Sequence, residues 1–129
     1  MARQFVVQLK NEPGAMATLA ESLAARGVDL RAIGGGSMGD SGHVIMTTAD
    51  DETAKAVLDE RGYTYIEGES ILAEVDDRPG GMARLARELA DAGVNIYGHL
   101  FLGRWGDVAT FAFVVDKPDV ARPILERKT

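Results

Sequence analysis

The residues whose spacing most suggests chemistry lie in the stretch IGGGSMGD at 33–40, where Gly34, Gly36 and Gly39 form a G-x-G-x-x-G pattern. In dinucleotide-binding proteins this pattern follows a strand and opens a helix, whose N-terminus faces the pyrophosphate. Here the stretch that follows, SGHVIMTTAD at 41–50, alternates and is β-branched, which predicts a strand. We therefore expect a hairpin end, where bare backbone lets another chain or a small ligand approach closely, and no cofactor.

The remaining candidates for catalysis or metal binding do not form a set. Neither His43 nor His99 lies at a metal-ligand spacing. The sequence has no cysteine, which excludes disulfides, thiolate metal sites and cysteine nucleophiles. No serine, histidine and carboxylate recur in an arrangement typical of nucleophilic catalysis. The sequence therefore predicts a protein that is not an enzyme and holds no metal.

Composition limits the class of partner. The chain has 129 residues, 46% of them hydrophobic, which suits one compact unit or two very small ones. The formal net charge is −6, so nucleic acid is not an expected partner. The N-terminal stretch reaches polar residues too soon for a signal peptide, and no apolar run approaches the roughly 20 residues that cross a bilayer. These features predict a soluble, cytoplasmic protein that does not bind membranes.

An internal repeat organises the chain. The segment EPGAMATLAESLAARGVDL at 12–30 aligns with RPGGMARLARELADAGVNI at 78–96, at an offset of 66 residues. The same offset aligns VIMTTAD at 44–50 with TFAFVVD at 110–116. We therefore expect two tandem copies of one unit.

Each copy is predicted to contain a strand, a helix, two strands and a second helix. The helical stripe in the first copy is formed by Met16, Leu19, Ala20 and Leu23. The fold class is therefore predicted to be α+β, with two tandem ferredoxin-like βαββαβ units at 1–69 and 70–129. The last strand of the second unit would fall beyond the chain end, and Pro123 is expected to shorten or kink the last helix. The open edge of that sheet would need covering by the other copy or by another subunit.

Both copies resemble the ACT domain, on the motifs NEPGAMATLAESLAARGVDL and DRPGGMARLARELADAGVNI. ACT domains are small ferredoxin-like modules that bind amino acids and regulate metabolic enzymes. The resemblance covers nearly the whole chain. It implies an amino acid held between paired ACT-like units, near the turn that joins the first strand to the first helix.

The resemblance also implies which residues contact the ligand. The side chain two residues before the proline belongs to Asn11 in the first copy and to Asp77 in the second, and a second contact falls at Asp29 and Asn95. With the neighbouring backbone, the implied ligand-binding residues are Asn11, Pro13, Gly14, Asp29, Leu30, Asp77, Pro79, Gly80, Asn95 and Ile96. Members that bind serine carry a histidine two residues before that asparagine, where this chain has Leu9 and Val75, so serine is not implied.

The residue types at these turns suit an amino acid on physical grounds as well. Free N–H groups at the helix starts after Pro13 and Pro79 favour a carboxylate, and Asn and Asp oxygens accept from an ammonium. An alternative is that Asn11 and Asp77 cap the helices or stabilise the turns.

We therefore expect a regulatory protein that binds a small amino acid and forms a homo-oligomer, such as a homodimer, because a unit of 66 residues is marginal alone. One alternative is a ligand-free interaction module or the regulatory subunit of an amino-acid metabolic enzyme. Another is a small enzyme on the same scaffold. Trp105, in the stretch LGRWGD at 102–107, is predicted to lie at a hairpin tip and to form a contact surface.

Overall fold

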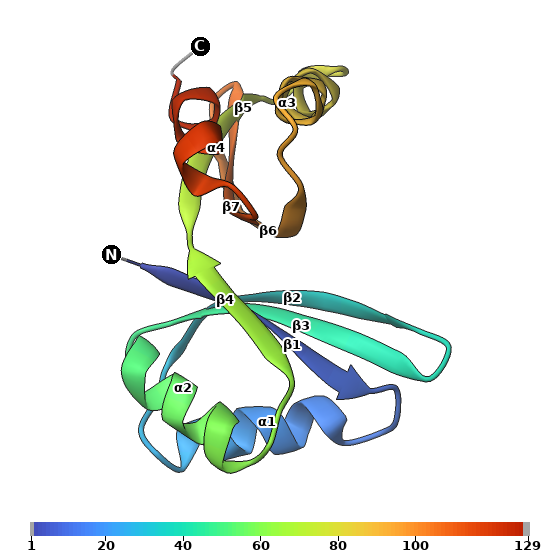
Figure 1. Cartoon of the computed structure of the whole chain (residues 1–129), viewed down its shortest axis with the longest axis vertical. Coiled ribbons are helices and arrows are strands. Elements are labelled where there is room, and N and C mark those ends of the chain that lie inside the picture. Colours follow the sequence, from blue (N-terminus) through green and yellow to red (C-terminus); the bar gives the residue numbers. More distant parts are fainter. Residues whose placement is uncertain (1, 128–129) are drawn as a thin grey trace. The chain divides into compact units, whose positions relative to one another are not determined.

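The structure, a computed structural model, describes residues 2–127 and divides into two compact units between Gly68 and Glu69 (Figure 1). Strand β4 (Tyr65–Glu69) ends the first sheet and strand β5 (Ile71–Asp76) begins the second, so the connection between them is a single residue. Among the helices within residues 2–127, none is long and apolar enough to cross a membrane.

The first unit is a complete ferredoxin-like unit. Its other elements are β1 (Arg3–Lys10), α1 (Ala15–Ala24), β2 (Leu30–Met38), β3 (Ser41–Thr48) and α2 (Asp51–Glu60). The sheet has the order β2-β3-β1-β4, and both helices cover one face (Figure 1). The predicted fold class is confirmed for this unit, and β2 is an edge strand.

The core of the first unit lies between this sheet face and the two helices. Phe5 pairs with Met46 and Val7 pairs with Val44, and all four side chains are buried. Leu19, Leu23, Val57 and Leu58 of the helices pack onto them. The predicted helical stripe is confirmed at Leu19 and Leu23. It is wrong at Met16, which is 52% exposed and lies in the first turn of α1.

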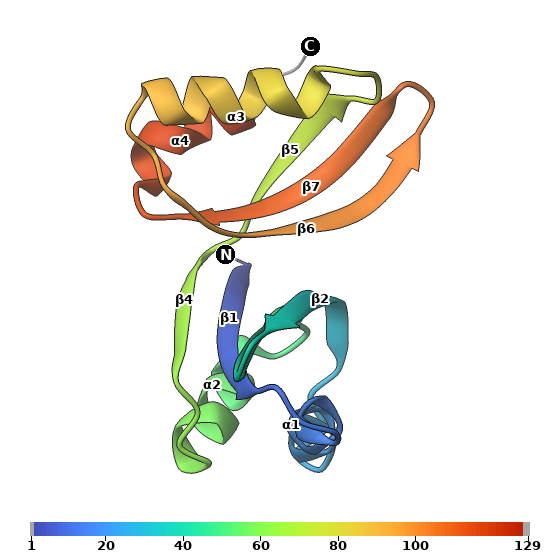
Figure 2. The same cartoon turned by 90° about the vertical axis from the view of Figure 1, so that its right-hand side faces the viewer.

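The second unit has the same layout with three strands. It comprises β5, α3 (Gly81–Asp91), β6 (Ile96–Trp105), β7 (Val108–Val115) and α4 (Pro118–Leu125). The sheet order is β5-β7-β6, with α3 and α4 on one face (Figure 2). Within residues 69–127 no fourth strand follows α4, as predicted. Helix α4 has eight residues against ten in α2 and contains Pro123, which confirms the predicted shortening.

The two copies do not keep a constant offset, and this corrects the sequence alignment. Leu9 and Val75 are 66 residues apart, whereas their strand partners Gly42 and Ala109 are 67 apart. The additional residue is Leu102, which lies in a β-bulge of β6. A bulge adds one residue to one strand without breaking the hairpin, so the sequence gap is invisible in the repeat motifs.

The correction changes which glycines have bulky counterparts. By strand pairing, Gly35 still corresponds to Phe101, but Gly36 corresponds to Gly103, and the turn residue Gly39 to Gly106. Strand β3 begins directly after the turn, so no helix follows the glycine pattern. The hairpin is confirmed, with its turn at 39–40, whereas Gly35 and Gly36 lie inside strand β2 and not at the hairpin end.

Candidate ligand-binding site

The first corner, which comprises residues 11–14, joins β1 to α1 and is fastened to the neighbouring hairpin. The backbone N–H of Asn11 donates to the carbonyl of Asp40 at 3.0 Å. The Asn11 side-chain Nδ2 donates to the carbonyl of Gly39 at 2.9 Å. Asn11 therefore stabilises the corner against the β2–β3 turn, and it does not cap α1.

Helix α1 begins without a side-chain cap among residues 2–127. Its N-terminal residue, Gly14, has a φ of 88°, a left-handed conformation that favours glycine. The first helical bond to close runs from the N–H of Thr18 to the carbonyl of Gly14, at 2.9 Å. The amides of the first turn are therefore left to bind an acceptor from outside the helix, and the helix dipole favours an anion there.

A groove of about 340 Å³ lies between this corner, the first turn of α1 and edge strand β2. Its volume falls in the range of roughly 300–1,000 Å³ that is typical of small-molecule sites. The groove is lined by Leu9, Lys10, Asn11, Glu12, Ala15, Met16, Ile33, Gly34, Gly35, Gly36, Ser37, Gly42, His43 and Val44. This set contains Asn11 of the implied ligand-binding residues, and the others were not predicted.

The floor of the groove is the helix-covered side of the sheet. Gly35 pairs with Val44, and Ser37 pairs with Gly42, which itself pairs with Leu9. Val44 is buried in the core, so these residues share its side of the sheet. A Cβ on Gly42 would lie 2.3 Å from the Ser37 hydroxyl oxygen, so the absence of that side chain leaves room for the hydroxyl.

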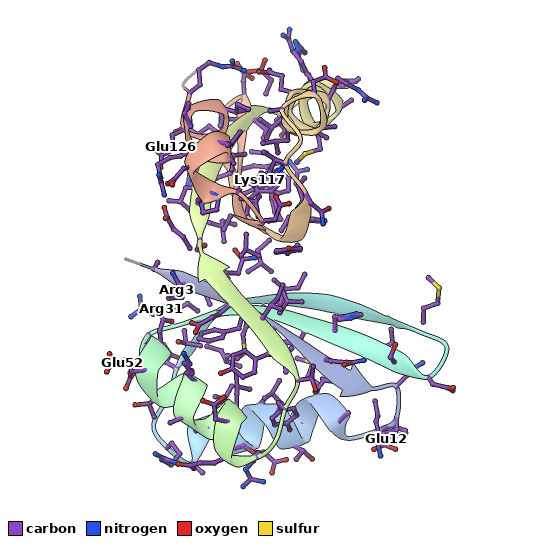
Figure 3. All side chains as sticks on the ribbon, in the orientation of Figure 1. Arg3, Glu12, Arg31, Glu52, Lys117 and Glu126 are labelled. Carbon is purple, nitrogen blue, oxygen red and sulfur yellow. The ribbon has the colours of Figure 1, made fainter. Side chains whose placement is uncertain are left out.

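Pro13 and Gly14 line a different hollow. It is wider, about 1080 Å³, and extends along the same corner toward the start of β4, where Arg61 and Thr64 contribute. Figure 3 shows Glu12 at the corner where β1 leads into α1. Glu12 lines both the groove and this hollow, so the corner separates two concave surfaces.

Asp29 and Leu30 lie far from the first corner. Leu30 pairs with Thr48 at one end of β3, whereas Lys10, which precedes Asn11, pairs with Ser41 at the other end. The seven steps along β3 correspond to roughly 23 Å at ~3.3 Å per residue. The first unit therefore does not bring Asp29 together with Asn11, and one unit alone cannot present both to the same small ligand.

The second corner, residues 77–80, is built in the same way but carries an ion pair. The N–H of Asp77 donates to the carbonyl of Asp107 at 2.8 Å, and Gly80 has a φ of 90°. The Asp77 carboxylate accepts from Nε of Arg104 at 2.8 Å. The Arg104 guanidinium carbon in turn lies 4.8 Å from the centre of the Phe101 ring. This corner uses its own cation to neutralise the carboxylate.

The ring of Phe101 occupies the place that Gly35 leaves open in the first unit. It packs edge-on against Phe111, which corresponds to Val44, with ring centres 5.6 Å apart. Near the second corner the structure has a hollow of only about 70 Å³, beside Asp76 and Gly81. The two units therefore differ in how much space the corner offers.

Asn95, Ile96 and Pro79 complete the set of implied residues. The N–H of Asn95 donates to the Asp116 carboxylate at 2.8 Å, and its carbonyl accepts from the N–H of Asp116 at 3.0 Å. Ile96 is half-buried against the core of the second unit. Pro79 is exposed in the second corner, at the opposite end of the sheet from these two residues.

The sequence carried one signal for the groove that the motif analysis did not use. Gly35 has no glycine counterpart, since Phe101 stands at its place, so the two copies differ there in side-chain volume. Within the part of the chain that the structure describes, no three His, Asp or Glu side chains are grouped so that they could hold a metal ion.

Comparison with known proteins gives structural matches only. No family model and no curated protein matches the sequence. Protein BT0572 from Bacteroides thetaiotaomicron is similar over 97% of this chain and 86% of its own, with 21% identity and a TM-score of 0.73. The ligand-free regulatory subunit of aspartate kinase from Thermus thermophilus is similar over 97% of this chain and 89% of its own, with 18% identity and a TM-score of 0.63.

A third solved structure extends the same pattern. The regulatory subunit of aspartate kinase from Thermus flavus is similar over 97% of this chain and 90% of its own, with 16% identity and a TM-score of 0.64. At these identities the likeness concerns the fold. The chain thus has the fold of an ACT-domain protein, with two tandem ACT-like units, as the sequence motifs predicted.

Proposed function

We propose that the chain is a cytoplasmic regulatory protein that binds a free amino acid in the groove of the first unit. The observation that carries the proposal is the combination, in one groove of about 340 Å³, of an uncapped helix N-terminus and the Asn11 carboxamide. An amino acid needs donors for its carboxylate and acceptors for its ammonium, and this groove supplies both within the first corner.

The polar groups of the groove divide between the two ends of an α-amino acid. The amides in the first turn of α1 face the carboxylate. Because Nδ2 of Asn11 donates to Gly39, the carboxamide is held in one orientation, and its Oδ1 makes no hydrogen bond within residues 2–127. That oxygen, the Ser37 hydroxyl and the Glu12 carboxylate are the acceptors for the ammonium. Hydrogen bonds to charged groups contribute roughly 1.5–3 kcal/mol each.

We assign the second side of the site to another copy of the chain. Asp29 lies at the far end of the sheet from Asn11, so a contact from both requires two molecules. In an isologous pair, Asp29 of one protomer approaches the first corner of its partner, and the reverse contact forms at the second site. A ligand that binds only the pair favours association in proportion to its affinity for that state, which is how occupancy is signalled.

The target of regulation in this proposal is an enzyme of amino-acid metabolism. Support comes from the fold, since structures titled as regulatory subunits of aspartate kinase match nearly the whole chain. In this role the chain has no catalytic activity of its own.

A second candidate function, a ligand-free interaction module, is favoured by the second unit. Its corner is filled by Arg104 and Phe101, and Trp105 beside it is 64% exposed. An exposed tryptophan at a hairpin tip is typical of a protein contact. Retrieval of one enzyme by the chain, with no amino acid bound, would favour this candidate.

Calorimetric titration of the full chain with each of the twenty amino acids tests the proposal. We expect at least one to bind, and Met16→Glu to weaken it at least tenfold, because the new carboxylate stands beside the ligand carboxylate. Met82→Glu is the matched control, since Met82 holds the same position in α3 and does not line the groove. A glutamate in the first helical turn favours the helix in both variants, so folding is preserved.

No heat of binding at millimolar amino acid would overturn the proposal. Equal loss of affinity in Met16→Glu and Met82→Glu would also overturn it, because the ligand would then lie outside the groove.

A further inference from the structure

The groove is polar at one end and apolar at the other, and this polarity follows the direction of β2. Ser37 and Asn11 lie at the end near the β2–β3 turn. Ile33 lies four residues earlier on the same side of β2, roughly 13 Å away at ~3.3 Å per residue. Between them Gly35 contributes no side chain, so a ligand can extend along the strand from one end to the other.

The apolar end is formed by aliphatic side chains. Ile33 is 41% exposed, and Met16 faces it from the first turn of α1 with 52% of its surface exposed. Val44 and Ala15 lie between them, and the Val44 side chain belongs to the core. Two large apolar side chains that line one groove and remain exposed present a surface that a ligand can cover.

Charged side chains are confined to the other end or to the other face. Lys10 pairs with Ser41, one residue out of phase with the groove residue Leu9, so it belongs to the opposite side of the sheet. His43 pairs with Gln8 and Gly36, which also places it on that side. Glu12 lies at the corner. A charged ligand side chain that reached Ile33 would therefore lose water without gaining a partner.

We infer that the ligand is an amino acid with an aliphatic side chain of three or four heavy atoms, such as valine, leucine, isoleucine or methionine. Its α-carboxylate and ammonium lie at the first corner, and its side chain crosses Gly35 and covers Ile33 and Met16. The inference rests on the proposed function and names the ligand class of the same site.

Competitive titration of the full chain with leucine, valine, alanine, lysine and aspartate tests the ligand class. Each added methylene is expected to tighten binding about fourfold, so leucine binds at least tenfold more tightly than alanine. Lysine and aspartate are expected to bind more weakly than leucine. Tighter binding of lysine, aspartate or another polar amino acid, still abolished by Met16→Glu, would overturn this inference and leave the proposed function standing. Binding of none of the twenty would overturn the proposed function itself.

A charge introduced at the apolar end gives an independent readout. Ile33→Asp is expected to reverse the preference from leucine to lysine, because the new carboxylate pairs with the lysine ammonium. The matched control is His99→Asp, at the corresponding position of the second unit, which is expected to leave the preference for leucine unchanged. If Ile33→Asp does not fold, Ile33→Ala is expected to weaken leucine at least fivefold and alanine less than twofold. Equal effects on leucine and alanine would contradict the inference.

Discussion

At the scale of single residues, Asn11 combines a structural contact with a ligand contact. Its amide nitrogen is engaged by Gly39, at 2.9 Å, and this contact fixes where its oxygen points. Asn11→Ala removes both. We expect the free energy of unfolding to fall by about 0.5–1.5 kcal/mol in chemical denaturation, because one exposed hydrogen bond is lost. The amino-acid Kd is expected to rise about tenfold, since a hydrogen bond to the charged ammonium contributes roughly 1.5–3 kcal/mol.

Asp77→Ala provides the comparison for Asn11. Asp77 holds the same position in the second corner and is paired with Arg104. Its removal is expected to leave the amino-acid Kd within twofold of the unchanged protein. An equal loss of affinity in both variants would place the ligand elsewhere.

Gly35 and Gly36 are neighbours in β2 with opposite tolerance of a side chain. Gly35 has a φ of 152°, and a Cβ there would lie 2.0 Å from the carbonyl oxygen of His43. Gly36 has open space around the same position. We expect Gly35→Ala to lower the free energy of unfolding by about 2 kcal/mol or more, because the backbone must move. Gly36→Ala is expected to change it by less than about 0.5 kcal/mol. Thermal denaturation of the two variants checks the difference, and equal melting temperatures would contradict it.

At the scale of elements, the repeat allowed the order of strands and helices to be predicted, but not the detail of the second hairpin. Leu19 and Leu23 recur in the second copy as Leu85 and Leu89, so the helix faces could be identified from the sequence. The bulge at Leu102 could not be identified, because one additional residue in a strand leaves no compositional signature.

The groove was missed for a related reason. A stripe at helical spacing does not tell where the sheet beneath the helix ends. Met16 satisfies the spacing, but it lies in the first turn of α1, beside an edge strand that carries glycine at Gly35. Tertiary context therefore decided whether this methionine joined the core or lined a groove.

Strand β4 is fastened to two other elements of the first unit through Glu67. Its carboxylate lies 2.9 Å from Nζ of Lys55 in α2 and 3.5 Å from Nε of Arg3 in β1. The hydrogen bond from Lys55 lowers the pKa of Glu67 below its usual value of 4.5, and Arg3 lowers it further. Because the pKa is lowered in the folded state, this stabilisation is present above about pH 4.5 and is lost as the pH falls through the folded-state pKa.

Glu67→Gln is therefore expected to lower the free energy of unfolding by about 0.5–1 kcal/mol at pH 7. Below the folded-state pKa of Glu67 the difference from the unchanged protein is expected to vanish. Denaturant titrations at pH 7 and pH 3 measure both values. Glu60→Gln is the control, since Glu60 forms an exposed pair with Arg26 and is expected to have little effect at either pH. A difference that persists at pH 3 would show that Glu67 acts through packing.

At the scale of the whole chain, two units with one ancestral layout are expected to bind one ligand. The first corner is open, whereas the second is filled by Phe101 and by the Arg104–Asp77 pair. Calorimetry is expected to give one amino acid per chain. A stoichiometry of two would show that the side chains of the second corner move aside, and it would contradict the assignment of a single site.

The separation of Asn11 and Asp29 within one sheet makes the proposed pairing of chains testable by mixing two defective variants. Neither Asn11→Ala nor Asp29→Ala alone forms an intact site in a pair that shares its sites, because every site contains one altered residue. Equal amounts of both form mixed pairs in half of the cases, and each mixed pair has one intact site and one doubly altered site. About a quarter of the sites should therefore regain full affinity, which a calorimetric titration of the mixture detects as a second class of tight sites. If Asn11 and Asp29 served the same site within a single chain, or if Asp29 did not contact the ligand, mixing would restore nothing beyond the average of the two variants. Recovery requires that the polar end of the groove be completed by a second copy, which would connect ligand binding to association.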